Sequence, residues 1–223
     1  SETEETVKRI LTFFRESVDE TGLIPLLPPP AWNFYEWSEG SSGEADKDRL
    51  HAPSSYDLIL NLAYLRAVSY ADALFGEKTD TEAMREAIRH TFYQEERGLY
   101  RLSTRDETYS VLGNSMAILA GLGDAALAKR MLADDTLVPV TLSMNTFFYD
   151  ALLSVGGYED LILSDILKKY VPMLDAGATT FWETEKGAED FGGAGSLCHG
   201  WSAMPVYYLR LLKEEKKKKG ELL

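Results

Sequence analysis

Residues 177–212 read GATTFWETEKGAEDFGGAGSLCHGWSAMPVYYLRLL. Two tryptophan segments stand in this stretch, Phe181-Trp182 and His199-Gly200-Trp201, and the carboxylate of Glu183 directly follows the first. A loop rich in Gly, Glu and Asp separates them, and the second leads into an apolar helical pattern. The C–H faces of a sugar ring stack on indole, and its hydroxyls need acidic and amide acceptors. The stretch therefore indicates a carbohydrate site, with Glu183 as its candidate catalytic carboxylate.

The composition is that of an ordinary globular protein. The chain has 223 residues, of which 45% are hydrophobic and 26% charged, and that length is enough for one domain with a real core or for part of a larger one. The formal net charge of −13 argues against nucleic acid or an anionic membrane surface as the main partner. An acidic surface suits a neutral substrate such as a glycoside, although most of the charge needs no more explanation than solubility.

Cysteine and histidine usage excludes two kinds of site. Cys198 is the single cysteine, so no internal disulfide forms, and beside His199 it raises the idea of a Cys/His nucleophile, for which no third orienting group is evident. The three histidines are His51, His90 and His199, and their spacing indicates no metal cluster. We expect neither a metal nor a cofactor.

Nothing in the sequence indicates a membrane segment or a leader. No run of 18 apolar residues occurs, and the N-terminus, SETEETVKRIL, has neither a basic start nor an apolar core. The chain also begins without Met and in the middle of a helical pattern, so we expect it to be part of a longer protein. Its compartment stays open: cytoplasmic, or exported with the parent protein.

Hydrophobic spacing predicts about eight helices of two kinds that alternate along the chain. Amphipathic patterns fall at 3–20, 79–93, 124–133 and 158–170, and largely apolar patterns at 54–75, 109–121, 143–155 and 202–212. A helix with one apolar stripe is half-exposed, and a helix that is apolar nearly all round is buried. The alternation therefore predicts an all-α fold with inner and outer layers, an incomplete (α/α)6 toroid; a plain orthogonal helical bundle is the alternative.

Caps and boundaries follow from local residue choice. The expected helix caps are Thr79 with Glu82 as a capping box, and Asp124, Ser143 and Ser202 as single N-caps. Residues 98–107 should form a turn with one short strand. We expect residues 1–212 to be a partial toroid domain with catalytic residues, and residues 213–223 to be a charged, solvated tail.

The two longest predicted loops, 23–52 and 171–198, both contain tryptophan and carboxylate residues. Long loops of a compact domain are usually functional or disordered. In a toroid, such loops collect at one mouth of the ring, where they would enclose a pocket. The first loop adds Trp32, Glu36 and Trp37 to the candidate site; its polar second half, from Glu39 to Arg49, reads as disordered.

Four runs carry a resemblance to a known family: TYSVLGNSMAILAGL, SMNTFFYDALLSVGGYED, ATTFWE and SLCHGWSA. With them the chain resembles, from about residue 6 to 212, the C-terminal part of the catalytic domain of bacterial α-L-rhamnosidases, glycoside hydrolase family 78. The last two runs are the specific part. The resemblance implies an (α/α)6 barrel, six-hairpin glycosidase-like, and hydrolysis of terminal α-L-rhamnose with inversion at the anomeric carbon.

The resemblance also implies residue roles and a substrate. L-Rhamnosyl glycosides are the implied substrates, and Glu183 matches the general base. The implied substrate-binding residues are Trp182, His199 and Trp201 by motif, and Trp32, Glu36 and Trp37 by a looser match.

One departure concerns the general acid. In the family it lies on an acidic segment, rich in Trp and ending in Gly-Asp, upstream of the matched region, and no such segment occurs here. A full barrel has twelve helices, so the eight predicted here would make about two thirds of it. Glu36, Glu39 and Glu185 are weak substitutes, because nothing in the sequence marks one as a proton donor. We therefore expect the isolated chain to be weakly active or inactive.

Two alternatives and one physical consequence accompany this interpretation. The chain could belong to another α/α-toroid glycosidase or lyase that acts on a different sugar, because fold does not determine substrate. It could also be a non-catalytic helical carbohydrate-binding or interaction module. An incomplete toroid leaves apolar inner helices facing water, so we expect self-association, or a partner that covers the open edge.

Overall fold

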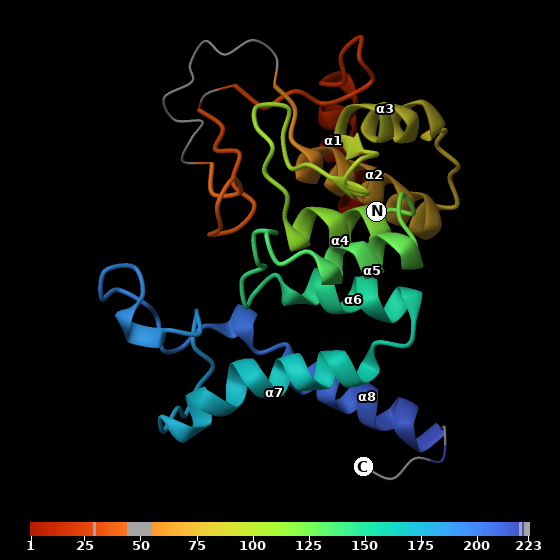
Figure 1. Cartoon of the computed structure of the whole chain (residues 1–223). Coiled ribbons are helices and arrows are strands. Elements are labelled where there is room, and N and C mark those ends of the chain that lie inside the picture. Colours follow the sequence, from red (N-terminus) through yellow and green to blue (C-terminus); the bar gives the residue numbers. More distant parts are fainter. Residues whose placement is uncertain (29, 44–54, 219, 221–223) are drawn as a thin grey trace. The chain divides into compact units, whose positions relative to one another are not determined.

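The computed structural model describes residues 1–28, 30–43, 55–218 and 220 (Figure 1). These residues form eight α-helices, one β-hairpin whose two strands have two residues each, and short 3-10 turns. The all-α prediction is confirmed. The chain divides into two compact units, Ser1–Pro139 and Val140–Leu223, and each is described by itself below.

The first unit contains five helices around the hairpin. Its elements are α1 (Glu2–Glu16), α2 (Leu58–Phe75), α3 (Glu82–Phe92), β1 (Tyr93–Gln94), β2 (Leu99–Tyr100), α4 (Val111–Leu119) and α5 (Ala125–Ala133). Helix α2 packs against α1, α3 and α4, and α4 also packs against α5 and β2. No residue of α1 is buried, whereas seven of the nine residues of α4 are. Exposed and buried helices thus alternate here as predicted.

Helix α2 is long and apolar enough, by length and composition, to cross a membrane, and among the described residues it is the one helix that is. A central helix of a water-soluble core meets the same criterion. Seven of its residues, including Leu58, Leu62 and Leu65, are buried against the neighbouring helices. This packing favours the role of a core helix.

The second unit contains the last three helices and two 3-10 turns. These are α6 (Asn145–Val155), α7 (Glu159–Asp175), η2 (Gly187–Glu189), η3 (Gly200–Ser202) and α8 (Pro205–Lys218). Helix α7 packs against both α6 and α8. The rings of Tyr149 and Tyr208 meet edge to face, with centroids 5.1 Å apart, and the Tyr149 hydroxyl donates to Asp165 at 2.6 Å. Burial, together with that carboxylate, raises the pKa of Tyr149 far above its usual value, so the hydroxyl stays a donor.

Of the predicted caps, Asp124 is confirmed. Its carboxylate accepts hydrogen bonds from the backbone N–H groups of Ala126 and Leu127, as an N-cap should. The predicted capping box is wrong. Thr79 instead donates its hydroxyl to the carboxylate of Asp72, and helix α3 begins after Thr81.

The other two predicted caps are also wrong. Ser143 lies one residue too early, because α6 begins after Met144, and the Ser143 hydroxyl hydrogen-bonds with that of Thr141. Ser202 belongs to the η3 turn. Helix α8 begins at Pro205, where the fixed φ angle of proline suits the first helical position.

Several helix ends differ from the sequence pattern. Helix α1 stops at Glu16 rather than residue 20, because the Asp19 carboxylate is held by the Thr21 hydroxyl and by Tyr56. Helix α7 continues to Asp175, with Pro172 inside it, which shortens the loop predicted from residue 171. Helix α8 continues to Lys218, past the boundary predicted after residue 212. The predicted start of α2 at residue 54, and most of the polar stretch after Glu39, lie outside the described residues.

Two buried asparagines hold chain segments against the central helices. The Asn61 side chain accepts from the N–H of Ile24 at 2.8 Å and donates to its carbonyl at 3.1 Å. Asn114 does the same for Tyr100, at 2.9 and 3.1 Å. Neither asparagine is exposed. Each amide therefore satisfies the backbone N–H and carbonyl of one residue in a neighbouring segment, and for Tyr100 it does so beside the strand pairing with Tyr93.

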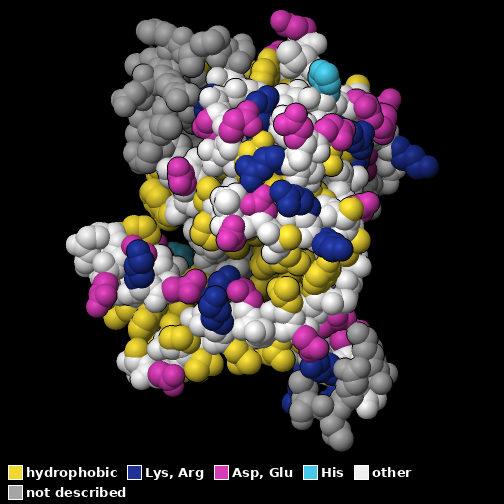
Figure 2. Space-filling view, in the orientation of Figure 1, with side chains coloured by type: hydrophobic (Ala, Val, Ile, Leu, Met, Phe, Trp, Pro, Cys, Tyr) yellow, Lys and Arg dark blue, Asp and Glu magenta, His cyan; other side chains and the backbone are white. Residues whose placement is uncertain are grey.

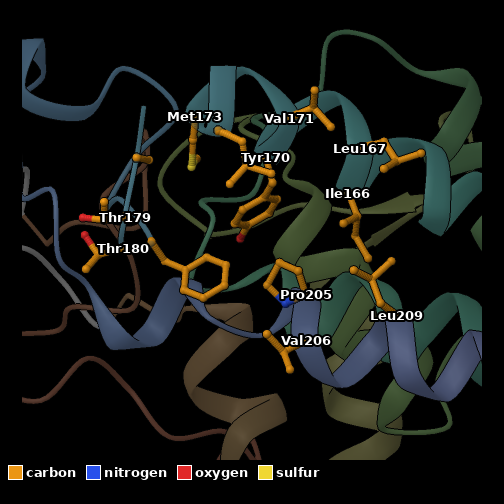
Figure 3. A pocket seen from close by; sticks show the side chains of 13 residues that line it. Ile166, Leu167, Tyr170, Val171, Met173, Thr179, Thr180, Pro205, Val206 and Leu209 are labelled. Atoms are coloured by element: carbon orange, nitrogen blue, oxygen red, sulfur yellow. The ribbon is translucent and has the colours of Figure 1, made fainter. Parts of the chain in front are cut away.

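An apolar groove runs between α7, α8 and residues 178–181 (Figure 3). Its volume is about 290 Å³, and Tyr170, Val206 and Leu209 are among its lining residues. Leu174 is 67% exposed and Val206 64%. Figure 2 shows hydrophobic side chains gathered on the surface over α7.

We predict that Asn114→Ala lowers the free energy of unfolding by about 2–4 kcal/mol, because a buried N–H and a buried carbonyl lose their partner together. Urea denaturation measures this. Asn33→Ala is the matched control. The Asn33 side chain also accepts from the N–H and donates to the carbonyl of one residue, Leu27, but it is only partly buried. Equal losses in the two variants would contradict the role given to burial.

The contribution of Asp134 to folding stability should depend on pH in the acid range. Hydrogen bonds from Thr136, then the guanidinium of Arg97, lower the pKa of Asp134 from 3.8 to about 2. A lowered pKa stabilises the folded state above the ordinary value, and that stability is lost as the pH falls from about 4 to about 2. Asp134→Asn should therefore melt earlier than the wild type at pH 7, with a gap in Tm that narrows over this acid range. Asp135→Asn, at an exposed neighbour, should show no such narrowing.

The exposed apolar residues of α7 and α8 predict concentration-dependent self-association of the isolated chain. A charge at Leu174 or Val206 would have to be desolvated in such a contact, so Leu174→Glu and Val206→Glu should sediment as monomers where the wild type associates. Leu74→Glu is the control, at a leucine that is 76% exposed on α2. A wild-type chain that stays monomeric at high concentration would refute the prediction.

Candidate functional site

The two specific motifs of the sequence lie side by side in the second unit. The N–H of Glu183 donates to the carbonyl of Ser196 at 2.9 Å, and the N–H of His199 donates to the carbonyl of Phe181 at 2.8 Å. The hydroxyl of Thr180 also donates to the carbonyl of Leu197. These bonds join residues 180–183 to residues 196–199 like two short antiparallel segments, so the fold brings Glu183 and His199 into one local structure.

Glu183 has a carboxylate held by the backbone. Its Oε2 accepts a hydrogen bond from the N–H of Ser196 at 3.2 Å, and its side chain is partly buried. Among the described residues, no Lys or Arg forms an ion pair with Glu183. The Ser196 amide therefore fixes the direction of the Glu183 carboxylate within this segment.

Ser196 is itself fixed by a tight turn. Its hydroxyl donates to the carbonyl of Cys198 at 3.1 Å and accepts from the N–H of Cys198 at 3.2 Å. Cys198 has a free thiol and is exposed. The turn thus positions the amide that binds Glu183, and sequence reasoning missed this role because a backbone donor leaves no signal in residue type.

Trp182 packs inward on the glycine loop that follows it. A Cβ atom placed on Gly187 would lie 2.6 Å from the Trp182 ring, and one on Gly195 would lie 1.9 Å from the carbonyl oxygen of Gly187. Gly187 also has a φ of +56°, a conformation that disfavours side chains. Both glycines are therefore required for close packing, and Trp182 supports the loop with at least one face of its ring.

Trp201 presents its ring to solvent beside His199. The two ring centroids are 6.0 Å apart and the rings are nearly perpendicular. Trp201 is 69% exposed. The η3 turn that carries it is tied to α7, because the Tyr170 hydroxyl donates to the carbonyl of Ser202 at 2.9 Å. An exposed indole on a fixed turn suits stacking against a sugar ring.

The remaining predicted residues lie in the first unit. Trp32 and Trp37 surround Phe34, with ring centroids 4.7 to 5.8 Å apart, and the Trp32 indole N–H donates to the carbonyl of Ser42 at 2.9 Å. Both indoles are 51% exposed, whereas Glu36 is 2% exposed. The structure thus brings the two tryptophans together. Their predicted convergence with Glu183 stays a prediction.

Phe34 is a member of this aromatic cluster that sequence reasoning did not single out. The run WNFYEW, residues 32–37, has four aromatic residues in six positions, and this density is the signal that would have found Phe34. Within the described residues, no group of three His, Cys, Asp or Glu side chains is arranged to hold a metal ion.

Solved structures are the known proteins to which this chain shows similarity. No family model and no curated protein matches the sequence. Among solved structures, the chain is similar to a GH78 family rhamnosidase of Bacillus sp. GL1, with a TM-score of 0.73 and 25% identity, over 93% of this chain and 23% of that one. It is also similar to a rhamnosidase from Klebsiella oxytoca with rhamnose bound, with a TM-score of 0.70 and 18% identity, over 94% of this chain and 42% of that one.

The chain therefore spans less than half the length of either rhamnosidase. Together with the helical order described above, the likeness confirms the resemblance predicted from the motifs. Along nearly its whole length, the chain is similar in structure to a part of glycoside hydrolase family 78 rhamnosidases, with the all-α fold class of an incomplete α/α toroid.

Proposed function

We propose that this chain provides the general base and part of the sugar-binding surface of an inverting α-L-rhamnosidase. The observation that carries the proposal is the hydrogen bond from the Ser196 N–H to the Glu183 carboxylate. It orients an unpaired carboxylate within the same local structure as His199 and an exposed indole. The likeness to rhamnosidases supports the choice of sugar.

In this mechanism Glu183 takes a proton from a water molecule. The water oxygen forms a bond to the anomeric carbon while the bond from that carbon to the leaving oxygen breaks. A carboxylic acid on the opposite side of the sugar gives its proton to the leaving oxygen. The two carboxyl groups of inverting enzymes stand roughly 6.5–9.5 Å apart, which leaves room for the water. We expect the acid to come from outside this chain.

The other residues bind and orient the sugar. Trp201 stacks on the apolar face of the rhamnose ring, whose methyl group favours an indole neighbour. His199 hydrogen-bonds a ring hydroxyl, and Trp182 holds the loop between the two motifs. Trp32 and Trp37 are further proposed substrate-binding residues, on the basis of the exposed aromatic cluster that the two indoles form with Phe34. Glu36, which was predicted with them, is only 2% exposed and is not proposed as a direct contact.

We predict that Glu183→Gln lowers kcat by about 10²–10⁴-fold, because the amide keeps the shape of the carboxylate but cannot accept the proton. The measurement is hydrolysis of p-nitrophenyl α-L-rhamnoside by the longer protein that we expect to carry this chain. Glu185→Gln is the matched control, since it removes an exposed carboxylate two residues away and should leave kcat unchanged.

Unchanged turnover in the Glu183→Gln variant would exclude Glu183 from the mechanism. The same assay on p-nitrophenyl glycosides of other sugars tests the alternative of a different substrate: faster hydrolysis of one of these than of the rhamnoside would favour it. The isolated chain should bind L-rhamnose while hydrolysing the rhamnoside weakly or not at all.

A further inference from the structure

The turn that carries His199 and Trp201 is held at both of its ends. Within the turn, the N–H of Ser202 donates to the carbonyl of His199 at 3.1 Å. At the first end, the N–H of His199 donates to the carbonyl of Phe181 at 2.8 Å. At the last end, the carbonyl of Ser202 accepts the hydroxyl of Tyr170 at 2.9 Å. Trp201 lies between these two points along the chain, so the direction in which its indole faces depends on both.

One side chain, that of Tyr170 on α7, contacts both ends of this turn. Its hydroxyl binds the carbonyl of Ser202 directly. Its ring meets the ring of Phe181 nearly at right angles, with the centroids 6.0 Å apart and an angle of 73° between the planes. Figure 3 shows the Tyr170 side chain pointing from α7 towards Pro205, the first residue of α8. Tyr170 thus ties the turn and the Phe181 segment to the same point of α7.

The partner of Tyr170 differs from the partners of the other tyrosines that are buried in the second unit. Tyr149 donates to Asp165 and so joins α6 to α7. Tyr208 donates to Asp150 and so joins α8 to α6. These two hydroxyls connect helix to helix, which is what the packing of the unit needs. The Tyr170 hydroxyl instead reaches from a helix to the backbone of the turn that carries the exposed indole.

The surroundings of Tyr170 keep its hydroxyl in place as a donor. The residue is only 7% exposed, so a rotation away from the turn would expose a large buried ring to water. Burial, and then the carboxylates of Glu185 and Asp165, raise the pKa of Tyr170 above its usual value. The phenol therefore stays protonated at neutral pH, and the bond to the turn persists.

We propose that Tyr170 is a positioning residue for sugar binding, which holds the turn and the Phe181 segment together so that His199 and Trp201 face the sugar at the same time. This inference rests on the proposed function and extends it to a residue outside the sequence motifs. Tyr170 does not touch the sugar itself. It acts through the backbone of Ser202 and the ring of Phe181.

The test uses the full 223-residue chain, its NMR spectrum and titration with L-rhamnose. Tyr170→Phe keeps the ring and removes only the hydroxyl. This variant should shift the indole N–H resonance of Trp201 and weaken the affinity for L-rhamnose by about three- to ten-fold, the population change that one neutral hydrogen bond can bring about. Phe181→Leu keeps an apolar side chain but removes the ring contact, and it should weaken the affinity in the same direction.

Tyr100→Phe is the matched control. The Tyr100 hydroxyl is also buried and also donates to a backbone carbonyl, that of Leu122 at 2.8 Å, but it does so in the first unit. Its removal should lower the Tm about as much as Tyr170→Phe does, because both variants leave a buried carbonyl without its donor. It should leave the Trp201 resonance and the affinity for L-rhamnose unchanged.

The comparison separates positioning from stability. Wild-type affinity in Tyr170→Phe would overturn the inference and leave the proposed function standing, and so would equal losses of affinity in Tyr170→Phe and Tyr100→Phe. If Tyr170→Phe does not fold, Phe181→Leu decides by the same criterion. A wild-type chain that does not bind L-rhamnose would instead overturn the proposed function, and this inference with it.

Discussion

The structure depends on satisfying backbone hydrogen bonds where no regular partner is available. Among its described residues, the first unit has one hairpin, of two-residue strands, and residues 30–43 before α2 form no helix or strand. Asn61 and Asn114, each in the first turns of a central helix, supply an acceptor and a donor to one residue of a neighbouring segment. Without these amides, buried N–H and carbonyl groups would lack partners, at a cost of about 1–3 kcal/mol for each group. These two side chains therefore fix the segments around Ile24 and Tyr100 against α2 and α4.

The second unit uses the same principle at the candidate site, with the roles of side chain and backbone exchanged. There a backbone N–H, that of Ser196, holds a carboxylate side chain. The arrangement requires residues 180–183 and 196–199 to lie side by side, and this in turn requires a loop that folds back closely on itself. Gly187 and Gly195 allow that approach because neither position has room for a Cβ. The glycine-rich composition of the loop is therefore a packing requirement of the site.

The sequence predicted the helices better than their ends. Hydrophobic period depends on many residues at once, so the alternation of exposed and buried helices could be predicted. A helix end depends on a few local competitions. Thr79 resembled a cap, but its hydroxyl donates to the Asp72 carboxylate instead. The pattern at 158–170 predicted an earlier end for α7, which continues through Pro172 to Asp175. The partner of Asn61 is 37 residues away along the chain, and no local pattern indicates a contact at that distance.

In the candidate site, too, residue-type motifs could be recognised in the sequence, whereas backbone contributions could not. Glu183, Trp182 and His199 could be predicted because a residue-type motif contains them, and the backbone pairing does bring Glu183 and His199 together. Ser196 could not, since its contribution is an N–H that every residue except proline has.

The groups that orient Glu183, the proposed base, are distinct from the proton donor that the proposed hydrolysis also requires. The groups described around Glu183, namely the Ser196 amide, the Cys198 turn and the glycine loop, all belong to residues 182–198 of the second unit. The described contacts that orient the Glu183 carboxylate therefore all lie within this segment. Inversion nevertheless needs a second carboxyl group on the far side of the sugar, and fold likeness alone does not supply one. Under the proposed function, this chain would therefore contribute an oriented carboxylate and an exposed indole to sugar binding, and the chemical step would need a proton donor from elsewhere.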